Sequence, residues 1–374
     1  MKLLYITYHY IDGYGGGVIA TKAYINAFAE LSDEITLLFP VKGTPVIKGL
    51  NPKVKATPLQ NDRSRFKKGW DLLTGRSNPF RLFTDYADNK RFDTVVFDTC
   101  MVSRGLIGLF KKQGIRIITV HHNNQYEFFR DNSKALLRLP TLFWVRRFER
   151  EAVRMSDLNI TLTEEDLQSL KKNYGTGAER FEVVGSFEDV RHSHPIYPSV
   201  NEPRFLITGG LNDVQTEKSL HYWIEHCFPI LKEQFPAASL TIAGRSPSDR
   251  LMNLAACHGI RIIPSPEDME PILAEAKYYI CPTFLGSGKK MRVLDGLSHG
   301  LPVICHSVSA RGYGSFINSG AVLEYNDVES FRLALQKLKK LDLDRKDTIR
   351  LYENELAFDR GKERLANALK TIIK

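Results

Sequence analysis

The chain is poor in cysteine and has no long apolar run, and these two features exclude several classes of protein. Its 374 residues include five cysteines, at positions 100, 227, 257, 281 and 305, with no Cys-x-x-Cys pair. This spacing argues against a zinc site or a disulfide framework and favours buried thiols in a reducing compartment. No run reaches the ~18–20 apolar residues of a bilayer-spanning helix, and the first apolar stretch is too short for a secretory leader. We therefore expect a cytoplasmic protein without a transmembrane segment.

Acidic residues are scarce relative to basic ones, and the imbalance belongs to the first half of the chain. The formal net charge is +9. Residues 1–185 hold 28 Lys and Arg against 20 Asp and Glu, whereas residues 186–374 hold 24 against 23. This excess predicts that the first half meets an anionic partner, although a merely soluble basic surface is the alternative interpretation.

Short β-rich runs alternate with helical stretches in both halves of the chain. Continuous apolar strands separated by helices are typical of parallel sheets covered on both faces. The proline-containing segment 186–203 breaks the rhythm and is assigned as a linker. It separates an N-terminal domain (1–185) from a C-terminal domain (204–345), and residues 346–374 are expected to be helical. The strand-like runs are 2–7, 35–39, 92–97, 116–120 and 157–162, then 205–208, 239–243, 261–263, 278–281 and 302–305.

Glycines and histidines follow two of these runs, where parallel sheets bind their ligands. Gly13-Tyr14-Gly15-Gly16-Gly17 lies between the first strand and a helix. It either lets the backbone approach a phosphate or sugar, or forms a flexible turn. His121 and His122 follow the strand 116–120; they either contact a substrate and transfer a proton, or make structural hydrogen bonds. No carboxylate or cysteine cluster accompanies them, so we expect no metal site.

The segment after the strand 278–281 carries the strongest motif. Gly286-Ser287-Gly288 is followed by Lys289, Lys290 and a helix. Free backbone N–H groups, the helix dipole and basic side chains would then converge on a diphosphate. Asp295 lies three residues after Arg292, which allows either an ion pair within the helix or a carboxylate that binds ribose hydroxyls. Arg245 follows the strand 239–243 and is either a phosphate clamp or a surface residue.

This segment resembles the signature of glycosyltransferases of the GT-B fold, in particular those of family 4 (glycosyl transferases group 1). The matching residues are Pro282, Gly286-Ser287-Gly288-Lys289-Lys290, Asp295 and Gly300-Leu301-Pro302-Val303. Gly15-Gly16-Gly17, His122-Asn123, Gly209-Gly210 and Gly244-Arg245 extend the likeness over most of the chain. The resemblance implies two Rossmann-like parallel-sheet domains facing a central cleft, with the helices of 346–374 crossing back to the first domain.

The resemblance also implies roles for individual residues. Gly16 and Gly17 would approach the donor, Arg245 and Lys290 would neutralise its diphosphate, and Asp295 would hold its ribose. Gly286, Ser287 and Gly288 would form the rest of the donor loop, and His121 or His122 would contact the transferred sugar. Two positions depart from the family, which has Glu where this chain has Ser287 and Asp295. The implied enzyme is a hexosyl- or related glycosyltransferase (EC 2.4), metal-independent and retaining, that needs no cofactor besides its nucleotide-diphosphate-sugar donor.

Two basic stretches give the charged first half a role. Basic and aromatic residues alternate over 63–81 and 138–154, and such stretches suit an anionic membrane surface or are solvated faces over core aromatics. The first domain would bind a glycan or polyprenyl-linked acceptor at the inner face of the membrane, in the synthesis of a cell-surface polysaccharide or glycolipid. The alternatives are a catalytically silent GT-B partner subunit and a sugar-nucleotide epimerase. No nucleic-acid-binding module is recognised.

Overall fold

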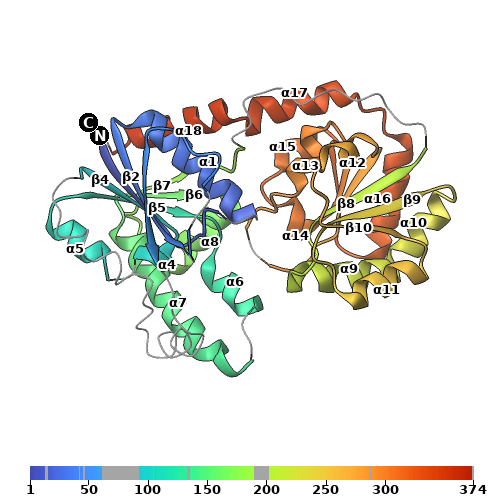
Figure 1. The fold of residues 1–374 in the computed structure, drawn as a ribbon, viewed down its shortest axis with the longest axis horizontal. Helices are drawn as coiled ribbons and strands as arrows, with labels where there is room; N and C mark the ends of the chain where they lie inside the picture. The colour runs from blue at the N-terminus through green and yellow to red at the C-terminus, as the bar shows by residue number, and fades with distance from the viewer. Residues whose placement is uncertain are drawn as a thin grey trace. The chain divides into compact units, whose positions relative to one another are not determined.

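The chain forms two compact α/β units (Figure 1). In the computed structural model, the described residues are 1–12, 16–41, 43–44, 47–60, 92–103, 105–132, 135–188, 202–286 and 288–372. Unit 1 comprises Met1–Val190 and Leu356–Lys374, and unit 2 comprises Arg191–Glu355. The chain passes from unit 1 to unit 2 within the stretch predicted as a linker, and residues 189–201 of it lie outside the described residues.

Unit 1 is built on a parallel sheet with the strand order β3-β2-β1-β4-β5-β6-β7. The order reverses between β1 and β4, and open parallel sheets commonly bind ligands beyond the carboxyl ends of the two strands at such a point. The strands are β1 (Lys2–Thr7), β2 (Glu34–Val41), β3 (Val54–Gln60), β4 (Thr94–Asp98), β5 (Arg116–His121), β6 (Leu158–Thr161) and β7 (Phe181–Val183). The helices are α1 (Gly16–Leu31), α4 (Cys100–Ser103), α5 (Ile107–Lys112), α6 (Gln125–Asn132), α7 (Ala135–Met155), α8 (Glu164–Tyr174) and α18 (Phe358–Lys370).

Alternate side chains of β1 enter the two cores of unit 1. Leu3 and Tyr5 are buried with α1 and α18 on one face of the sheet, and Leu4 and Ile6 are buried on the other face, with α5. Such two-sided burial explains why this strand is a continuous apolar run. On α1 the side chain of Ile19 is 46% exposed.

The C-terminal helix α18 packs on α1 in unit 1 (Figure 1). Gly361 allows a close approach, because a Cβ atom there would lie 2.0 Å from the ring of Phe187. Lys362 adds an ion pair of 2.8 Å with Glu30 of α1. Residues from the C-terminal end of the sequence therefore complete the core of unit 1.

Unit 2 has a parallel sheet with the strand order β10-β9-β8-β11-β12-β13, which reverses between β8 and β11. The strands are β8 (Arg204–Gly210), β9 (Ser239–Arg245), β10 (Arg261–Pro264), β11 (Tyr278–Cys281), β12 (Val303–His306) and β13 (Val322–Tyr325). The helices are α9 (Val214–His226), α10 (Phe228–Gln234), α11 (Asp249–Cys257), α12 (Glu270–Ala274), α13 (Val293–Ser298), α14 (Ser307–Ala310), α15 (Gly314–Asn318), α16 (Val328–Lys340) and α17 (Arg345–Leu356).

Unit 2 extends to Glu355, beyond the residue 345 at which the sequence analysis ended the second domain. Arg345 at the start of α17 donates a hydrogen bond of 2.6 Å to the carbonyl of Ala276. Gly300 lies against the same residue, and a Cβ atom there would be 2.5 Å from the Arg345 carbonyl oxygen. These contacts attach the start of α17 to unit 2, whereas α18 belongs to unit 1.

Candidate functional site

A buried carboxylate organises the carboxyl ends of β1 and β4 in unit 1. Asp98, the last residue of β4, accepts hydrogen bonds from the hydroxyls of Tyr5 (3.0 Å), Thr7 (2.6 Å) and Thr21 (2.9 Å). Its other contact is with Nε2 of His122, 2.5 Å away. Burial alone would raise the pKa of Asp98, but the charge of His122 and the hydrogen bonds from His122 and Thr7 hold it below its ordinary value. The carboxylate therefore stays ionised at neutral pH.

The Asp98 carboxylate determines which ring nitrogen of His122 carries a proton. Because Nε2 meets a carboxylate, the ring carries a proton on that nitrogen. The Nδ1 atom is buried and has no hydrogen-bond partner among the described residues. Held in this way, the ring can present its other nitrogen to a partner, as a histidine does when a carboxylate orients it for proton transfer. The geometry suits either proton transfer or the acceptance of a hydrogen bond from a sugar hydroxyl.

The neighbouring His121 has a different environment. Its side chain is buried, and Nε2 lies 2.9 Å from the Oδ1 atom of Asn159 on β6. Burial lowers the pKa of His121 to about 4, against the opposing effect of that hydrogen bond. Since a parallel strand alternates its side chains, the two adjacent histidines point to different surroundings. The Nδ1 atom of His121, like that of His122, is buried and has no hydrogen-bond partner among the described residues, so that a sugar contact by either histidine stays a prediction.

The glycines at the start of α1 leave room for a second imidazole. A Cβ atom at Gly17 would lie 2.9 Å from Cε1 of His9. The His9 ring stacks on Tyr8 at 4.3 Å and lies 5.9 Å from the ring of His122. Burial lowers the pKa of His9 to about 4, with Asp98 opposing and His122 reinforcing the shift. Gly16 and Gly17 thus open the helix beside these rings, while residues 13–15 of the predicted glycine turn lie outside the described residues.

In unit 2, two glycines shape the predicted phosphate loop after β11. Gly286 and Gly288 have φ angles of +91° and +72°, a region that favours glycine. A Cβ atom at Gly286 would also lie 2.4 Å from the Oε1 atom of Gln215 on α9. Both glycines are therefore required by the backbone path. Ser287 between them lies outside the described residues.

Two of the three cations that follow this loop, Lys290 and Arg292, influence each other electrostatically. Lys290 is largely buried, and burial together with the charge of Arg292 lowers its pKa to about 8. The guanidinium of Arg292 donates a 3.0 Å hydrogen bond to the hydroxyl of Thr216 on α9. It also lies over Gly209, where a Cβ atom would be 2.8 Å from Nη1. A side chain at that position would displace Arg292, so the glycine at the end of β8 makes room for this cation.

The adjacent strand β9 ends on another required glycine. A Cβ atom at Gly244 would lie 1.9 Å from the carbonyl oxygen of Gly209. Arg245, which follows it, is exposed and pairs in register with Gly210 of β8. Glycines therefore lie at the carboxyl ends of both strands, where they allow close packing, and two basic residues, Arg245 and Arg292, lie beside them. This is the environment that a bound anion needs.

Asp295 turns toward the sheet. Its Oδ2 atom accepts a 2.7 Å hydrogen bond from the hydroxyl of Thr208 on β8. Burial raises the pKa of Asp295, although Thr208 and Arg292 oppose the shift. The local alternative was an ion pair between Arg292 and Asp295, but the two side chains hydrogen-bond to Thr216 and Thr208 respectively. A role for Asp295 with a ribose stays a prediction.

Several residues of these clusters were not predicted from the sequence. Asp98, His9 and Thr21 in unit 1 and Gln215 and Thr216 in unit 2 carry no motif of their own. One signal was present, since Asp98 is a carboxylate directly after a continuous apolar strand, where a parallel sheet presents its functional groups. The remaining four are brought in by helices and loops that only the tertiary fold places.

Two further observations concern metals and membranes. Within the described ranges, no three or more His, Cys, Asp or Glu side chains are grouped so that they could hold a metal ion. Among the helices of the same residues, none is long and apolar enough to cross a membrane.

The chain was compared with known proteins by sequence and by structure. The family described as "Glycosyl transferases group 1" matches residues 202–340. No curated protein matches the sequence. Similar structures include Anabaena HepE in complex with UDP and glucose, with a TM-score of 0.68, 11% identity and 100% of both chains covered. A mutant of S. aureus TarM in complex with fondaparinux, alpha-GlcNAc-glycerol and UDP has a TM-score of 0.71 and 10% identity, covering 98% of this chain and 99% of TarM.

WaaG, a glycosyltransferase involved in lipopolysaccharide biosynthesis, has a TM-score of 0.66 and 16% identity, with 98% of each chain covered. At such low identities these structures establish the fold, and the family match covers the loop from Gly286 to Lys290 and the helix that bears Asp295. Residues 202–340 thus match the glycosyl transferases group 1, and the chain as a whole has the GT-B fold, with two parallel-sheet α/β domains.

Proposed function

We propose that the chain is a glycosyltransferase that moves a sugar from a nucleotide-diphosphate sugar to a glycan or lipid-linked acceptor, in the synthesis of a cell-surface polysaccharide or glycolipid. The observation that carries the proposal is the cationic, glycine-lined surface at the carboxyl ends of β8 and β11. It lies in the region that matches the glycosyl transferase family. The presence of UDP in the HepE and TarM structures makes a UDP-sugar the first donor to test.

In this proposal Lys290 and Arg292 carry the charge of the leaving diphosphate. Preorganised cations stabilise charge that develops in a transition state, because they need no reorganisation when the bond breaks. Arg292 is held by Thr216, so its position is set before the donor arrives. Gly209 lets the Arg292 guanidinium lie over the end of β8, and Gly244 lets β9 approach the Gly209 carbonyl closely, so that the end of the sheet packs tightly beside this cation. We expect this step to proceed without a metal, and activity that persists in excess EDTA would agree with that expectation.

In unit 1, the proposed role of His122 is to contact the reacting sugar through Nδ1. Asp98 holds the opposite nitrogen and sets the tautomer. Asp98 thereby acts through His122 as a positioning residue. A hydrogen bond from a sugar hydroxyl to Nδ1 would satisfy an atom that is buried and unpartnered among the described residues.

A calorimetric titration with UDP tests the donor site. We expect Lys290→Ala to weaken UDP binding by roughly 10- to 100-fold, the usual effect of losing a hydrogen bond to a charged group. Glu225→Ala, in a solvent-exposed part of α9, is the matched control and should bind UDP as the wild type does. Unchanged affinity in Lys290→Ala would refute the diphosphate role. UDP binding without transfer to any acceptor would instead indicate a silent GT-B partner subunit.

We further propose that α7 docks on an anionic membrane surface and presents the acceptor there. Leu139 and Phe143 lie one helical turn apart and are 80% and 62% exposed. The exposed arginines Arg138, Arg146 and Arg147 flank them. Apolar side chains bordered by basic ones match the interface of an acidic bilayer, where each basic residue contributes about 1 kcal/mol. The other basic stretch, 63–81, lies outside the described residues.

Co-sedimentation with vesicles of phosphatidylglycerol tests this surface. The wild-type protein should pellet at low salt, and the double variant Leu139→Ser and Phe143→Ser should stay largely in the supernatant. Leu333→Ser is the control, because Leu333 is likewise an exposed leucine, 50% exposed, but lies on α16 of unit 2. Equal pelleting of all three proteins would remove α7 from the proposal.

A further inference from the structure

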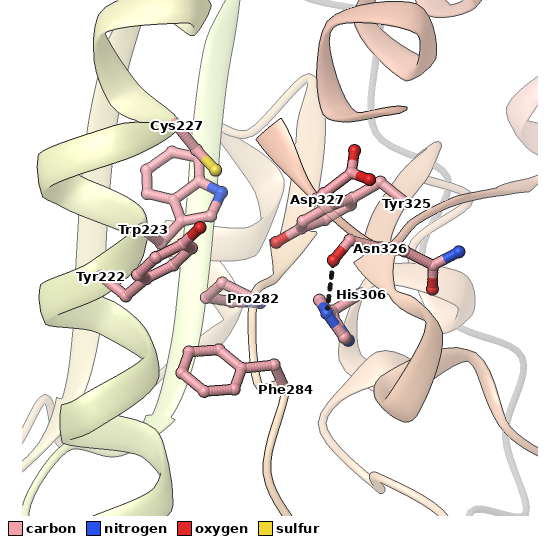
Figure 2. A pocket seen from close by; sticks show the side chains of 9 residues that line it. All are labelled: Tyr222, Trp223, Cys227, Pro282, Phe284, His306, Tyr325, Asn326 and Asp327. Atoms are coloured by element: carbon pink, nitrogen blue, oxygen red, sulfur yellow. Dashed lines mark hydrogen bonds between the residues drawn. The ribbon is translucent and has the colours of Figure 1, made fainter. Parts of the chain in front are cut away.

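A pocket in unit 2 has a lining that the proposed donor site does not use. It has a volume of about 340 Å³ and lies at the carboxyl ends of β11, β12 and β13, beneath α9 (Figure 2). Its walls are aromatic: Tyr222 and Trp223 come from α9, Phe284 from the loop after β11, and His306 and Tyr325 from the ends of β12 and β13. Small-molecule sites are typically concave and aromatic-lined, with a few placed polar groups.

One polar group in the closed part of this pocket needs a partner. Trp223 is 1% exposed, and its Nε1 atom has no hydrogen-bond partner among the described residues. Buried indole N–H groups usually find an acceptor. Figure 2 shows this nitrogen and the hydroxyl of Tyr325 directed into the same hollow from opposite walls. A ligand with hydroxyl groups could satisfy the Trp223 donor from inside the pocket.

The angles between the rings indicate what shape would fit. Tyr222 and Phe284 meet at 72° with centroids 5.5 Å apart, and His306 and Tyr325 meet at 82° with centroids 5.4 Å apart. Phe284 and His306 are tilted at 53°. A flat nucleobase is held best between parallel faces, whereas these rings stand at steep angles to one another. They form the walls of a box, which suits a puckered ring with C–H groups on its faces.

The rim of the pocket is polar. His306 is fixed because its Nδ1 atom accepts from the backbone N–H of Val308 at 3.2 Å, while Nε2 donates to the carbonyl of Asn326 at 3.1 Å. Its ring is therefore a wall, not a titrating group. The exposed side chains of Asn326 and Asp327 border the opening, where they can meet hydroxyl groups. The combination is an apolar box with a donor inside and hydrogen-bonding groups at the mouth.

We propose that this pocket is a carbohydrate subsite that binds one neutral pyranose ring, separately from the nucleotide. The ring can belong to an acceptor glycan or to a free saccharide, because both present the same chemistry. Phe284 is part of the loop that continues into Gly286, so an occupied pocket would border the predicted phosphate loop. The proposal that the bound ring is part of an acceptor rests on the proposed function. The proposal that a pyranose binds in this pocket does not.

Saturation-transfer NMR with a panel of methyl hexopyranosides, in the absence of nucleotide, tests the proposal on the full chain. At least one glycoside should receive saturation at its ring protons. Tyr222→Ala should abolish this transfer without unfolding the protein, because Tyr222 is 43% exposed. Trp223→Phe removes the N–H group and should weaken binding roughly two- to tenfold, the effect of one neutral hydrogen bond. Lys290→Ala should bind the glycoside as tightly as the wild type.

Controls separate the possible outcomes. The melting temperature of each variant shows that it is folded. UDP binding by the Tyr222 and Trp223 variants reports on the donor site independently, so the two proposals can fail separately. Competition with an oligosaccharide distinguishes an acceptor glycan from a free sugar. Glycoside binding that disappears in Lys290→Ala, displacement of the glycoside by uridine alone, or the absence of transfer from every glycoside would each overturn the proposal.

Discussion

The low pKa of Lys290 makes a quantitative prediction about donor binding. Burial and the nearby Arg292 lower this pKa from an ordinary value of 10.5 to about 8. A bound diphosphate would raise it again, because an opposite charge favours the ammonium form. Wild-type affinity for UDP should therefore be level up to about pH 7.5 and fall roughly tenfold by pH 9, as the free protein loses the proton. At pH 8 binding should take up about half a proton, measurable by calorimetry in buffers of different ionisation enthalpy.

Two variants isolate the effect. An arginine at position 290 keeps its charge between pH 7.5 and 9, so the affinity of Lys290→Arg for UDP should be independent of pH. The same variant is a control for titration of the uracil ring, which would affect both proteins. The same burial predicts a stability effect of the opposite sign. The folded protein releases the Lys290 proton near pH 8 and the unfolded chain near 10.5, so stability rises between these values, by up to about 3 kcal/mol. Lys290→Met should therefore raise the melting temperature at pH 7 while it weakens UDP binding. A flat wild-type profile, or the same pH dependence in Lys290→Arg, would contradict a role for the Lys290 proton in UDP binding.

Three more predictions follow from other residues. Asp98→Asn should lower turnover roughly 10²- to 10⁴-fold, because the tautomer of His122 is then no longer fixed by a carboxylate. Its affinity for UDP should stay within about twofold of the wild type. A loss of UDP affinity as large as the loss of turnover would contradict a positioning role for Asp98. Gly244→Ala should cost more than about 2 kcal/mol in a urea titration, because its Cβ atom would lie 1.9 Å from the Gly209 carbonyl oxygen, whereas Gly314→Ala, with open space around it, should be nearly neutral. Burial raises the pKa of Glu149 to about 7, so the stability of the folded protein should fall as pH rises from about 4.5 to 7. Glu149→Gln should flatten that part of the plot of melting temperature against pH. An unchanged plot would contradict the raised pKa of Glu149.

The sequence predicted the interior strands of both sheets and the edge strand β10, but it missed the other three edge strands. Strands β1 and β11 were predicted with the bounds that the structure shows, because they lie inside a sheet and their apolar runs are continuous. The strands β3, β7 and β13 were missed, and all three lie at sheet edges. The edge strand β3 has no buried side chain and contains Pro58, as edge strands often do. Such segments lack the signal that burial on two faces imposes.

For the candidate site, local motifs were readable and tertiary partners were not. Gly286, Gly288 and Lys290 form one contiguous motif whose backbone requirements are visible in the residue types. Arg292 was seen only as a neighbour of Asp295 along the helix, because its contact with Gly209 joins residues 83 positions apart. Asp98 and His122 likewise come from separate strands, and only the register of β4 and β5 brings their ends together.

The return of α18 to unit 1 has a consequence for biosynthesis. Phe358, Leu365 and Leu369 complete the core beneath α1, yet the ribosome makes them only after all of unit 2. Until then one apolar face of the sheet in unit 1 is partly uncovered. The ribosome must first synthesise the 165 residues of unit 2, Arg191–Glu355, before it adds α18 to this core. Nascent chains arrested before residue 356 should accordingly be captured by chaperones that bind apolar surface, and release should coincide with the emergence of the final helix.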